Sequence, residues 1–378
     1  MAHVLMLLSN PFRPDPRAHK EAKTLMGAGH KVTILCWDRL GKSPKTEEID
    51  GIHIIRLGPL YTKRELGKFP IKLIRFWMKA FSAARHIKPD VVHAHDFDTL
   101  PLGFDISRFH GARLVYDAHE IYSAMLGPDG QDSVLGRFID RLEAFFARRA
   151  DRVITVSDGL AARFKDRGVT AIVVTNCPLL TKVDAQGTES LRAKHSLGND
   201  FIVLYIGVLE PDRFLEEAVK AVRASSLDGV RLVIGGFGTL EARIKELARD
   251  SENVIMLGKV HPSLVVPYTG ECDAVLCIFD PMHNLNNRLG APNKLFEAMM
   301  ASRPVLVAKG TEAANLVGRE RSGVAVDYAI ESLLPAIKQL MDNPDIAKAL
   351  GQNARKAAED KYNWEAVSKG LAEAYASL

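Results

Sequence analysis

The chain has 378 residues, of which 47% are hydrophobic and 25% charged, and its formal net charge is +4. This length and balance are typical of a globular protein of two domains, which excludes a small scaffold that needs disulfides or metals to fold. Four scattered cysteines form no CxxC pair, so neither a disulfide framework nor a zinc site is indicated and a reducing compartment is expected. The first apolar run, residues 4–8, is too short for a signal peptide or a membrane span and predicts a strand.

Short apolar runs alternate with helical patterns through the first half of the chain. Helices are predicted at 20–28, 134–149 and 158–164, the last with Ser157 as its N-cap. This alternation is typical of a parallel sheet that helices cover on both faces. The runs that predict strands are 3–8, 31–37, 53–56, 91–94, 114–117, 153–156 and 172–174.

A polar stretch at 181–200 interrupts the pattern, which then restarts with strands predicted at 201–206, 231–234, 254–257, 274–278 and 305–308. The prediction is an α/β protein with two doubly wound, Rossmann-like domains facing a central cleft. The domains span residues 1–178 and 199–361, and a last helix within 362–378 packs back on the first domain. Ligands of open α/β sheets bind at the carboxyl ends of the strands, so the loops there are the expected site.

The segment 61–90 is strongly basic, with eight lysines and arginines against Glu65 and Asp90, and it also carries many apolar and aromatic residues. Two interpretations remain open. The segment could form a helix packed on its own sheet with a solvated basic face, or an amphipathic helix on an anionic membrane surface. Nucleic acid is not expected as a partner, because no recognition motif accompanies the charge.

The stretch "APNKLFEAMM" at 291–300 has the features of an anion-binding helix start. Pro292 suits a first helical turn, which would leave the backbone N–H groups of Asn293, Lys294 and Leu295 as open donors for a phosphate. Lys294 adds a full positive charge. Glu297, about one turn further in, could accept hydrogen bonds from two hydroxyl groups of a ribose. Alternatively, it is an N-terminal-turn glutamate that only interacts favourably with the helix dipole.

The longer stretch "PNKLFEAMMASRPVLVA" resembles the donor-binding helix of the retaining GT-B glycosyltransferases of family 4, the glycosyl transferases group 1. The resemblance implies that Glu297 binds the nucleotide ribose and that the backbone at Asn293 and Lys294 holds the diphosphate. Many members have a second glutamate eight residues earlier, where this chain has Leu289. Polar contacts there could come from Asn286, Asn287 or Asp280.

Three further stretches of the second half resemble donor-site segments of the same family. "YIGVLEPDRFLEEAVKAV" places Arg213 at the second of two basic positions and Val208 at the first; the alternative for Arg213 is a surface arginine at a helix start. "VIGGFG" resembles a glycine turn that includes Gly236 and lets the backbone approach a ligand. "LGKVHPS" resembles the loop that meets the nucleobase through its backbone near Lys259 and Val260.

The first half resembles the other side of the family's active site. "VYDAHEIY" implies that His119 faces the donor sugar as a catalytic residue with Glu120 beside it, the alternative being a structural histidine. "SNPFRPDPRAHKEAKTLMGAGHKVTIL" resembles the first strand, loop and helix, where Arg17 would approach the donor phosphate or sugar unless it is a loop arginine in solvent.

"HAHDFD" at 93–98 contains an Asp-x-Asp and a His-x-His pattern, either of which can hold a metal. His93 and His95 would share one face of a strand. The longer stretch "VVHAHDFDTLPLG" resembles a family segment without a metal role, so no metal ligand is predicted here.

The resemblance implies a hexosyl-type glycosyltransferase that retains the anomeric configuration and needs neither metal nor other cofactor. Its donor is expected to be a nucleotide-diphosphate sugar, a UDP-sugar in preference to a GDP-sugar. Its acceptor is expected to be a glycan or a lipid-linked sugar, in the cytoplasm or on the inner face of the cell membrane. The alternatives are a GT-B nucleotide-sugar epimerase and a non-catalytic subunit that binds nucleotide sugars.

Overall fold

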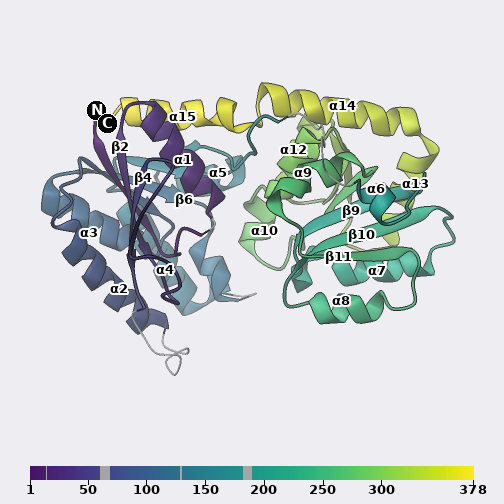
Figure 1. The fold of residues 1–378 in the computed structure, drawn as a ribbon, viewed down its shortest axis with the longest axis horizontal. Helices are drawn as coiled ribbons and strands as arrows, with labels where there is room; N and C mark the ends of the chain where they lie inside the picture. Colours follow the sequence, from purple (N-terminus) through teal and green to yellow (C-terminus); the bar gives the residue numbers. More distant parts are fainter. Residues whose placement is uncertain (14, 60–68, 128–129, 182–189) are drawn as a thin grey trace. The chain divides into compact units, whose positions relative to one another are not determined.

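The computed structural model describes the chain except for residues 14, 60–68, 128–129 and 182–189 (Figure 1). It divides into two compact units. The N-terminal unit comprises residues 1–175 and 368–378, and the C-terminal unit comprises residues 176–367. Each unit is an α/β domain built on a sheet whose described strands are almost all parallel.

The N-terminal sheet has the strand order β3-β4-β2-β1-β5-β6-β7-β8. Its strands are parallel apart from β3, which pairs antiparallel with β4. The central strands are buried along nearly their whole length, which explains why the sequence shows continuous apolar runs there. The strands are β1 (His3–Leu8), β2 (Lys31–Trp37), β3 (Thr46–Ile49), β4 (Ile52–Leu57), β5 (Val91–His95), β6 (Arg113–Ala118), β7 (Arg152–Thr155) and β8 (Ala171–Val173).

Helices flank this sheet. The largest hydrophobic cluster of the unit packs α2 and α3 against the strands, and the ring of Phe76 stacks on Trp37 with centroids 5.2 Å apart. The end of α15 belongs to the same unit, where the ring of Tyr375 lies 5.6 Å from that of His30. The helices are α1 (Pro16–Gly27), α2 (Phe69–Ala84), α3 (Leu100–His110), α4 (Val134–Ala147), α5 (Asp158–Asp166) and α15 (Trp364–Ala376), with 3-10 turns η2 (Tyr122–Leu126) and η3 (Gly130–Asp132).

The C-terminal sheet has the order β11-β10-β9-β12-β13-β14 and is parallel throughout its described strands. Two hydrophobic clusters cover its faces. Its strands are β9 (Phe201–Val208), β10 (Val230–Phe237), β11 (Val254–Gly258), β12 (Ala274–Cys277), β13 (Val305–Ala308) and β14 (Gly323–Val326). Its helices are α6 (Leu191–Lys194), η4 (Pro211–Arg213), α7 (Leu215–Ala224), α8 (Glu241–Leu247), α9 (Pro262–Gly270), α10 (Leu285–Leu289), α11 (Asn293–Met300), α12 (Glu312–Glu320), α13 (Ile330–Asp342) and α14 (Pro344–Asp360).

The sequence missed two strands, β3 and β14. β3 reads Thr-Glu-Glu-Ile and is half-exposed at the sheet edge, so it lacks an apolar pattern. The first helix begins at Pro16, four residues before the predicted start, because Asp15 caps it by accepting a hydrogen bond from Ala18 N. The predicted cap of α5 is confirmed, since Ser157 Oγ accepts from Leu160 N.

The basic segment 61–90 contains α2, while its residues 61–68 lie outside the described part of the chain. The inner face of α2 is buried through Phe76 and Ala80. Its outer face exposes Ile71, Ile74 and Met78 by 49%, 52% and 61%. Nowhere in the described chain is a helix both long and apolar enough to cross a membrane.

Candidate functional site

The predicted helix start in the C-terminal unit is present as the first turn of α11. Pro292 is the N-cap residue, and Asn293 and Lys294 occupy the first two helical positions. Backbone N–H groups at these positions have no acceptor within an α-helix and face outward along the positive end of its dipole. Leu295 N, however, donates to Pro292 O at 3.0 Å. The expectation of an open donor was therefore wrong for Leu295.

Lys294 lies against aromatic rings. Its Nζ is 3.5 Å from the centroid of Tyr205 on β9 and 5.1 Å from that of Phe279, just after β12. Removal of the ammonium from water lowers the pKa of Lys294 to about 7, even though Cys277 and Glu297 act to raise it. A lysine in this environment is poised to gain a full charge when an anion binds beside it.

Gly207, at the end of β9, makes room for this lysine. A Cβ atom on Gly207 would lie 3.0 Å from Lys294 Nζ. The end of β9 therefore has no side chain where the ammonium sits.

Arg213 lies beside the same aromatic ring as Lys294. Its Cζ is 4.1 Å from the centroid of Phe279, and its Nη1 donates to Asn287 Oδ1 at 3.2 Å. Asn287 is itself held by Asp212, whose Oδ2 accepts from Nδ2 at 2.8 Å. The structure thus brings together two cations, from η4 and α11, around one phenylalanine.

The backbone directly after Arg213 is held in an uncommon conformation. The next residue, Phe214, is fully buried and has φ of +57°. Left-handed backbone at a bulky residue costs free energy and is maintained only where the surrounding packing demands it. Burial of Phe214 supplies that packing and fixes the turn from which the Arg213 side chain projects.

Gly236 and Val260 lie near the end of β9. Gly236 has φ of +136°, and a Cβ there would lie 1.8 Å from Gly207 O, so only glycine fits. Val260 Cγ2 would lie 2.7 Å from a Cβ on Gly235. The glycine turn and the Val260 loop therefore pack beside the strand end that borders Lys294. Glu297 lies one helical turn beyond Lys294, half-buried.

His119 in the N-terminal unit follows β6 and is held by two carboxylates. Its Nε2 donates to Asp117, and its backbone N–H donates to Asp96 Oδ1 at 3.0 Å. Burial would lower the pKa of His119, but Asp117 and Asp96 outweigh burial and raise it well above its usual value. Glu120, the next residue, is exposed. His119 is thus a partly exposed, oriented imidazolium.

Arg17 points into the N-terminal unit, with 4% of its surface exposed. Its Nη2 and Nε donate to Asp117 Oδ1 and Oδ2 at 2.8 and 3.1 Å, and its Nη1 donates to Val174 O at 2.7 Å. The alternative of a loop arginine in solvent was therefore wrong. That Arg17 approaches the phosphate or sugar of the donor stays a prediction. In the structure its guanidinium holds Asp117, which in turn orients His119.

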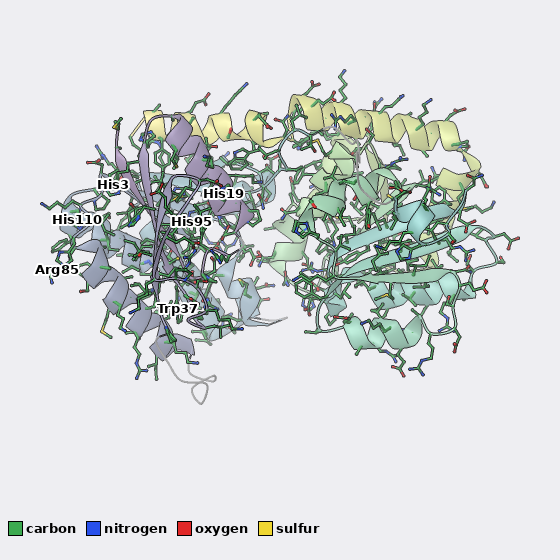
Figure 2. The ribbon with its side chains drawn as sticks, viewed as in Figure 1. His3, His19, Trp37, Arg85, His95 and His110 are labelled. Carbon is green, nitrogen blue, oxygen red and sulfur yellow. The ribbon has the colours of Figure 1, made fainter. Side chains whose placement is uncertain are left out.

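Sequence reasoning did not assign Asp117, Asp212 or Tyr205. A signal for Asp117 exists, because it precedes His119 by two residues at the end of a buried strand. For Asp212 and Tyr205 we find no such signal, since their roles depend on Asn287 and Lys294, about 75 and 90 residues away in the chain. Figure 2 shows the side chains of both units, with His95 among the strands of the N-terminal one.

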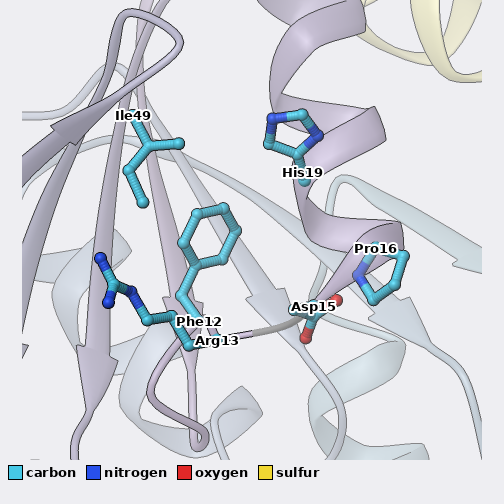
Figure 3. Close-up of a pocket in the computed structure, with 6 residues that line it drawn as sticks. All are labelled: Phe12, Arg13, Asp15, Pro16, His19 and Ile49. Carbon is cyan, nitrogen blue, oxygen red and sulfur yellow. The ribbon is translucent and has the colours of Figure 1, made fainter. Parts of the chain in front are cut away.

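A pocket of about 450 Å³ opens at the start of α1 in the N-terminal unit (Figure 3). Arg13, on one side of it, pairs with Glu47 of β3. The ring of Phe12 lies among the lining groups, facing the space between Ile49 and His19. The pocket therefore combines an apolar floor with charged groups. Its lining residues are Phe12, Arg13, Asp15, Pro16, His19 and Ile49.

Two family models match the chain. The glycosyl transferase 4-like domain matches residues 14–178, and the glycosyl transferases group 1 domain matches residues 187–357. Glycogen synthase from Mycobacterium tuberculosis is 22% identical, covering 94% of this chain and 89% of its own. The capsular polysaccharide biosynthesis glycosyltransferase CapM of Staphylococcus aureus is 23% identical over 48% of this chain and 47% of its own.

The fold is similar to that of solved glycosyltransferase structures. Sucrose-phosphate synthase from Thermosynechococcus elongatus superposes with a TM-score of 0.80 at 18% identity, covering 100% of this chain and 99% of its own. Anabaena HepE in complex with UDP superposes with a TM-score of 0.72 at 18% identity, covering 100% of both chains. Because the two family models together match residues 14–178 and 187–357, the chain belongs to the group 1 glycosyltransferases and is a transferase enzyme of GT-B fold.

Proposed function

We propose that this enzyme transfers a sugar from a nucleoside-diphosphate sugar, with retention of configuration and without a metal ion. The observation that carries the proposal is the pair of cations around Phe279, Lys294 Nζ and the Arg213 guanidinium, at the N-terminus of α11. Transfer develops negative charge on the leaving diphosphate, and groups already fixed around that charge lower the barrier most. Two cations and a helix start supply this stabilisation without a divalent ion.

The remaining donor contacts follow from the same helix. Glu297, one turn further in, is proposed to accept hydrogen bonds from both ribose hydroxyl groups. Acidic residues bind ribose in this way in dinucleotide-binding folds. The backbone near Gly236 and Val260 is proposed to contact the sugar phosphate and the base. UDP is the preferred nucleotide of the proposal, and it is supported by the structures of HepE solved with UDP and with UDP-glucose.

His119 is proposed to position the donor sugar, with Glu120 beside it, and this assignment rests on the family resemblance. Contacts from Arg17 to Asp117 and from Asp117 to His119 would then fix the orientation of the imidazole. In a front-face mechanism the leaving phosphate oxygen itself accepts the proton of the acceptor hydroxyl. A separate general base is then unnecessary.

The acceptor is proposed to be a glycan or a lipid-linked sugar, bound on the N-terminal unit. Two features support this. The pocket at the start of α1 has room for part of a sugar. The outer face of α2 presents Ile71, Ile74 and Met78 next to the exposed Arg75 and Lys79. Such a face suits the boundary of an anionic membrane, where apolar groups insert and cations meet head groups.

Incubation with nucleotide sugars in the presence of EDTA tests the proposal. We expect release of the nucleoside diphosphate to depend on an acceptor, and NMR to show a product with the anomeric configuration of the donor. Inverted product, or loss of transfer in EDTA that only a divalent ion restores, would contradict it. A nucleotide-sugar epimerase would instead convert the donor without acceptor.

The second candidate, a non-catalytic nucleotide-sugar-binding subunit, is favoured by Leu289 at the end of α10 and by the exposed Val208. The family resemblance implies charged residues at these positions. Leu289→Glu discriminates between the two candidates. If transfer occurs only in this variant while wild type binds nucleotide without turnover, the binding subunit is correct.

A further inference from the structure

Four buried side chains converge inside the N-terminal unit. Glu21 lies on α1, His93 and His95 lie on β5, and Asp117 lies on β6, and each is at most 2% exposed. One possible ligand atom from each lies within 4.8 Å of all the others. His93 and His95 share a strand face, and their rings stack with centroids 4.5 Å apart. Three separate elements thus direct nitrogen and oxygen atoms at one point.

The Nδ1 atoms of the two histidines have hydrogen-bond partners, whereas their Nε2 atoms have none in the described structure. His93 Nδ1 is 2.7 Å from Tyr375 Oη, and His95 Nδ1 is 3.4 Å from His119 Nε2. As metal ligands, the two neutral imidazoles would present the lone pair of Nε2 and carry their hydrogen on Nδ1.

Three buried atoms that could each bind a metal ion lie near one another. Glu21 Oε2 lies 3.6 Å from His93 Nε2 and 3.9 Å from His95 Nε2, and all three atoms are buried without a hydrogen-bond partner in the described structure. These separations are too long for a proton to be shared directly between them. Buried polar atoms without partners are uncommon, because each costs desolvation free energy. A cation between them would satisfy all three at once.

The separations are close to those between two ligands of one metal ion. Ligands about 2.0–2.2 Å from a tetrahedral Zn²⁺ lie roughly 3.3–3.6 Å from each other, and Glu21 Oε2 lies 3.6 and 3.9 Å from the two Nε2 atoms. Asp117 Oδ2 lies 3.9 Å from His93 Nε2, but it already accepts hydrogen bonds from Arg17 Nε and His119 Nε2.

The charges nearby leave Glu21 as the carboxylate available to a cation. Asp117 is paired with the Arg17 guanidinium and the His119 imidazolium, whereas Arg17 Nε lies 3.0 Å from Glu21 Oε1, the outer oxygen of Glu21. Glu21 Oε2 lies nearest the histidines. Two imidazoles with one carboxylate suit Zn²⁺ and its neighbours in the first transition series.

We propose that Glu21, His93 and His95, beside Asp117, bind one divalent transition-metal ion of the Zn²⁺ type as a buried structural site. The ion would fasten α1 to β5 and β6, while the Tyr375 hydroxyl, by accepting from His93 Nδ1, would tie α15 to the same site. Contacts of this kind orient metal-bound histidines in other proteins. No metal was expected at "HAHDFD" from the sequence, because the carboxylate that completes the cluster, Glu21, lies over 70 residues earlier in the chain.

The groups assigned to the diphosphate are not ligands of this ion. Lys294 and Arg213 belong to the C-terminal unit, whereas Glu21, His93 and His95 belong to the N-terminal unit, beside the Asp117 carboxylate that holds His119.

Direct metal analysis of the full-length protein tests the proposal. The protein is produced without a histidine tag in medium supplemented with Zn²⁺ or Co²⁺, passed over a desalting column, and analysed by mass spectrometry of its metal content. We expect about one ion per chain. The Co²⁺ form is expected to show the intense visible absorption of a tetrahedral site.

Variants identify the ligands. The affinity for the metal ion should be at least tenfold lower in Glu21→Gln and in His95→Gln than in wild type. His19→Gln is the matched control, because it removes a histidine paired with a carboxylate, Asp50, at the surface 2.9 Å away. This control should keep its metal. Added Zn²⁺ should raise the melting temperature of metal-depleted wild type and of the control, but not that of Glu21→Gln.

Two results would overturn the proposal. The first is wild-type protein that emerges from the column without stoichiometric metal and without a tetrahedral Co²⁺ spectrum. This result does not depend on whether any variant folds. The second is metal that Glu21→Gln and His95→Gln retain as tightly as wild type, which would place the ion elsewhere.

Discussion

Lys294→Met is predicted to stabilise the empty enzyme and to weaken its binding of nucleotide. Lys294 is held against Tyr205 with its pKa lowered to about 7, so the folded protein disfavours its charged form. An ordinary lysine titrates about 3.5 pH units higher, and each unit corresponds to ~1.4 kcal/mol, giving an upper bound of about 5 kcal/mol. Because the side chain keeps some contact with solvent, we expect a gain of about 1–2 kcal/mol for the variant.

The sign of the pH dependence follows from proton binding. Between pH 7 and about 10.4 the unfolded chain holds a proton on Lys294 that the folded chain has released. The unfolding free energy of wild type should therefore rise with pH across this window, and Lys294→Met should lack that rise. A bound diphosphate favours the charged lysine, so wild-type affinity for nucleotide should fall as the pH rises above 7.

Thermal unfolding and titration calorimetry measure both effects. The melting temperature of the empty variant should exceed that of wild type by about 3–6 °C at pH 7. Its affinity for the nucleoside diphosphate should be about 10- to 100-fold lower, as expected for loss of a charged hydrogen bond. Lys309→Met removes an exposed lysine paired with Asp327 and should change neither quantity. A variant that is less stable than wild type yet binds equally well would refute the reasoning.

Three shorter predictions follow from other parts of the structure. Gly236→Ala should lose about 3 kcal/mol or more of unfolding free energy in chemical denaturation, because its Cβ would overlap a backbone oxygen, whereas Gly258→Ala, with φ of +67° and open space around it, should lose only about 1 kcal/mol. Arg213→Gln should weaken nucleotide binding about tenfold in calorimetry while keeping its melting temperature; unchanged affinity would remove it from the donor site. Arg75→Glu combined with Lys79→Glu should lower sedimentation with anionic vesicles but not with neutral ones, and equal sedimentation would exclude the membrane interpretation of α2.

The sequence predicted the fold well because both sheets are buried on both faces. Apolar runs such as 31–37 and 305–308 coincide with whole strands, since a strand covered on both sides needs apolar residues throughout. β3 was missed for the opposite reason. It is a polar edge strand stabilised by its antiparallel pairing with β4, and its sequence carries no period that indicates a strand.

The candidate site could be predicted only where its residues are close in sequence. Glu297 and Lys294 share one helix, so spacing alone indicated their arrangement. The contact of Lys294 with Tyr205 depends instead on the pairing of β9 with β12, which determines what lies at the carboxyl end of β9. The pairing of Arg17 with Asp117 joins positions 100 residues apart and depends on the strand order β1-β5-β6 in the sheet. No local pattern encodes such neighbours.

The central claim is that the start of α11 holds a nucleoside diphosphate without a metal, with Glu297 on the ribose. The most direct test is calorimetric binding of UDP, GDP and ADP, each with EDTA, to wild type and to Glu297→Ala. We predict that UDP binds wild type in EDTA and that the variant binds it at least tenfold more weakly, or ~1.4 kcal/mol. If none of the three nucleotides binds, or if Glu297→Ala binds UDP as tightly as wild type, the helix is structural and the claim is wrong.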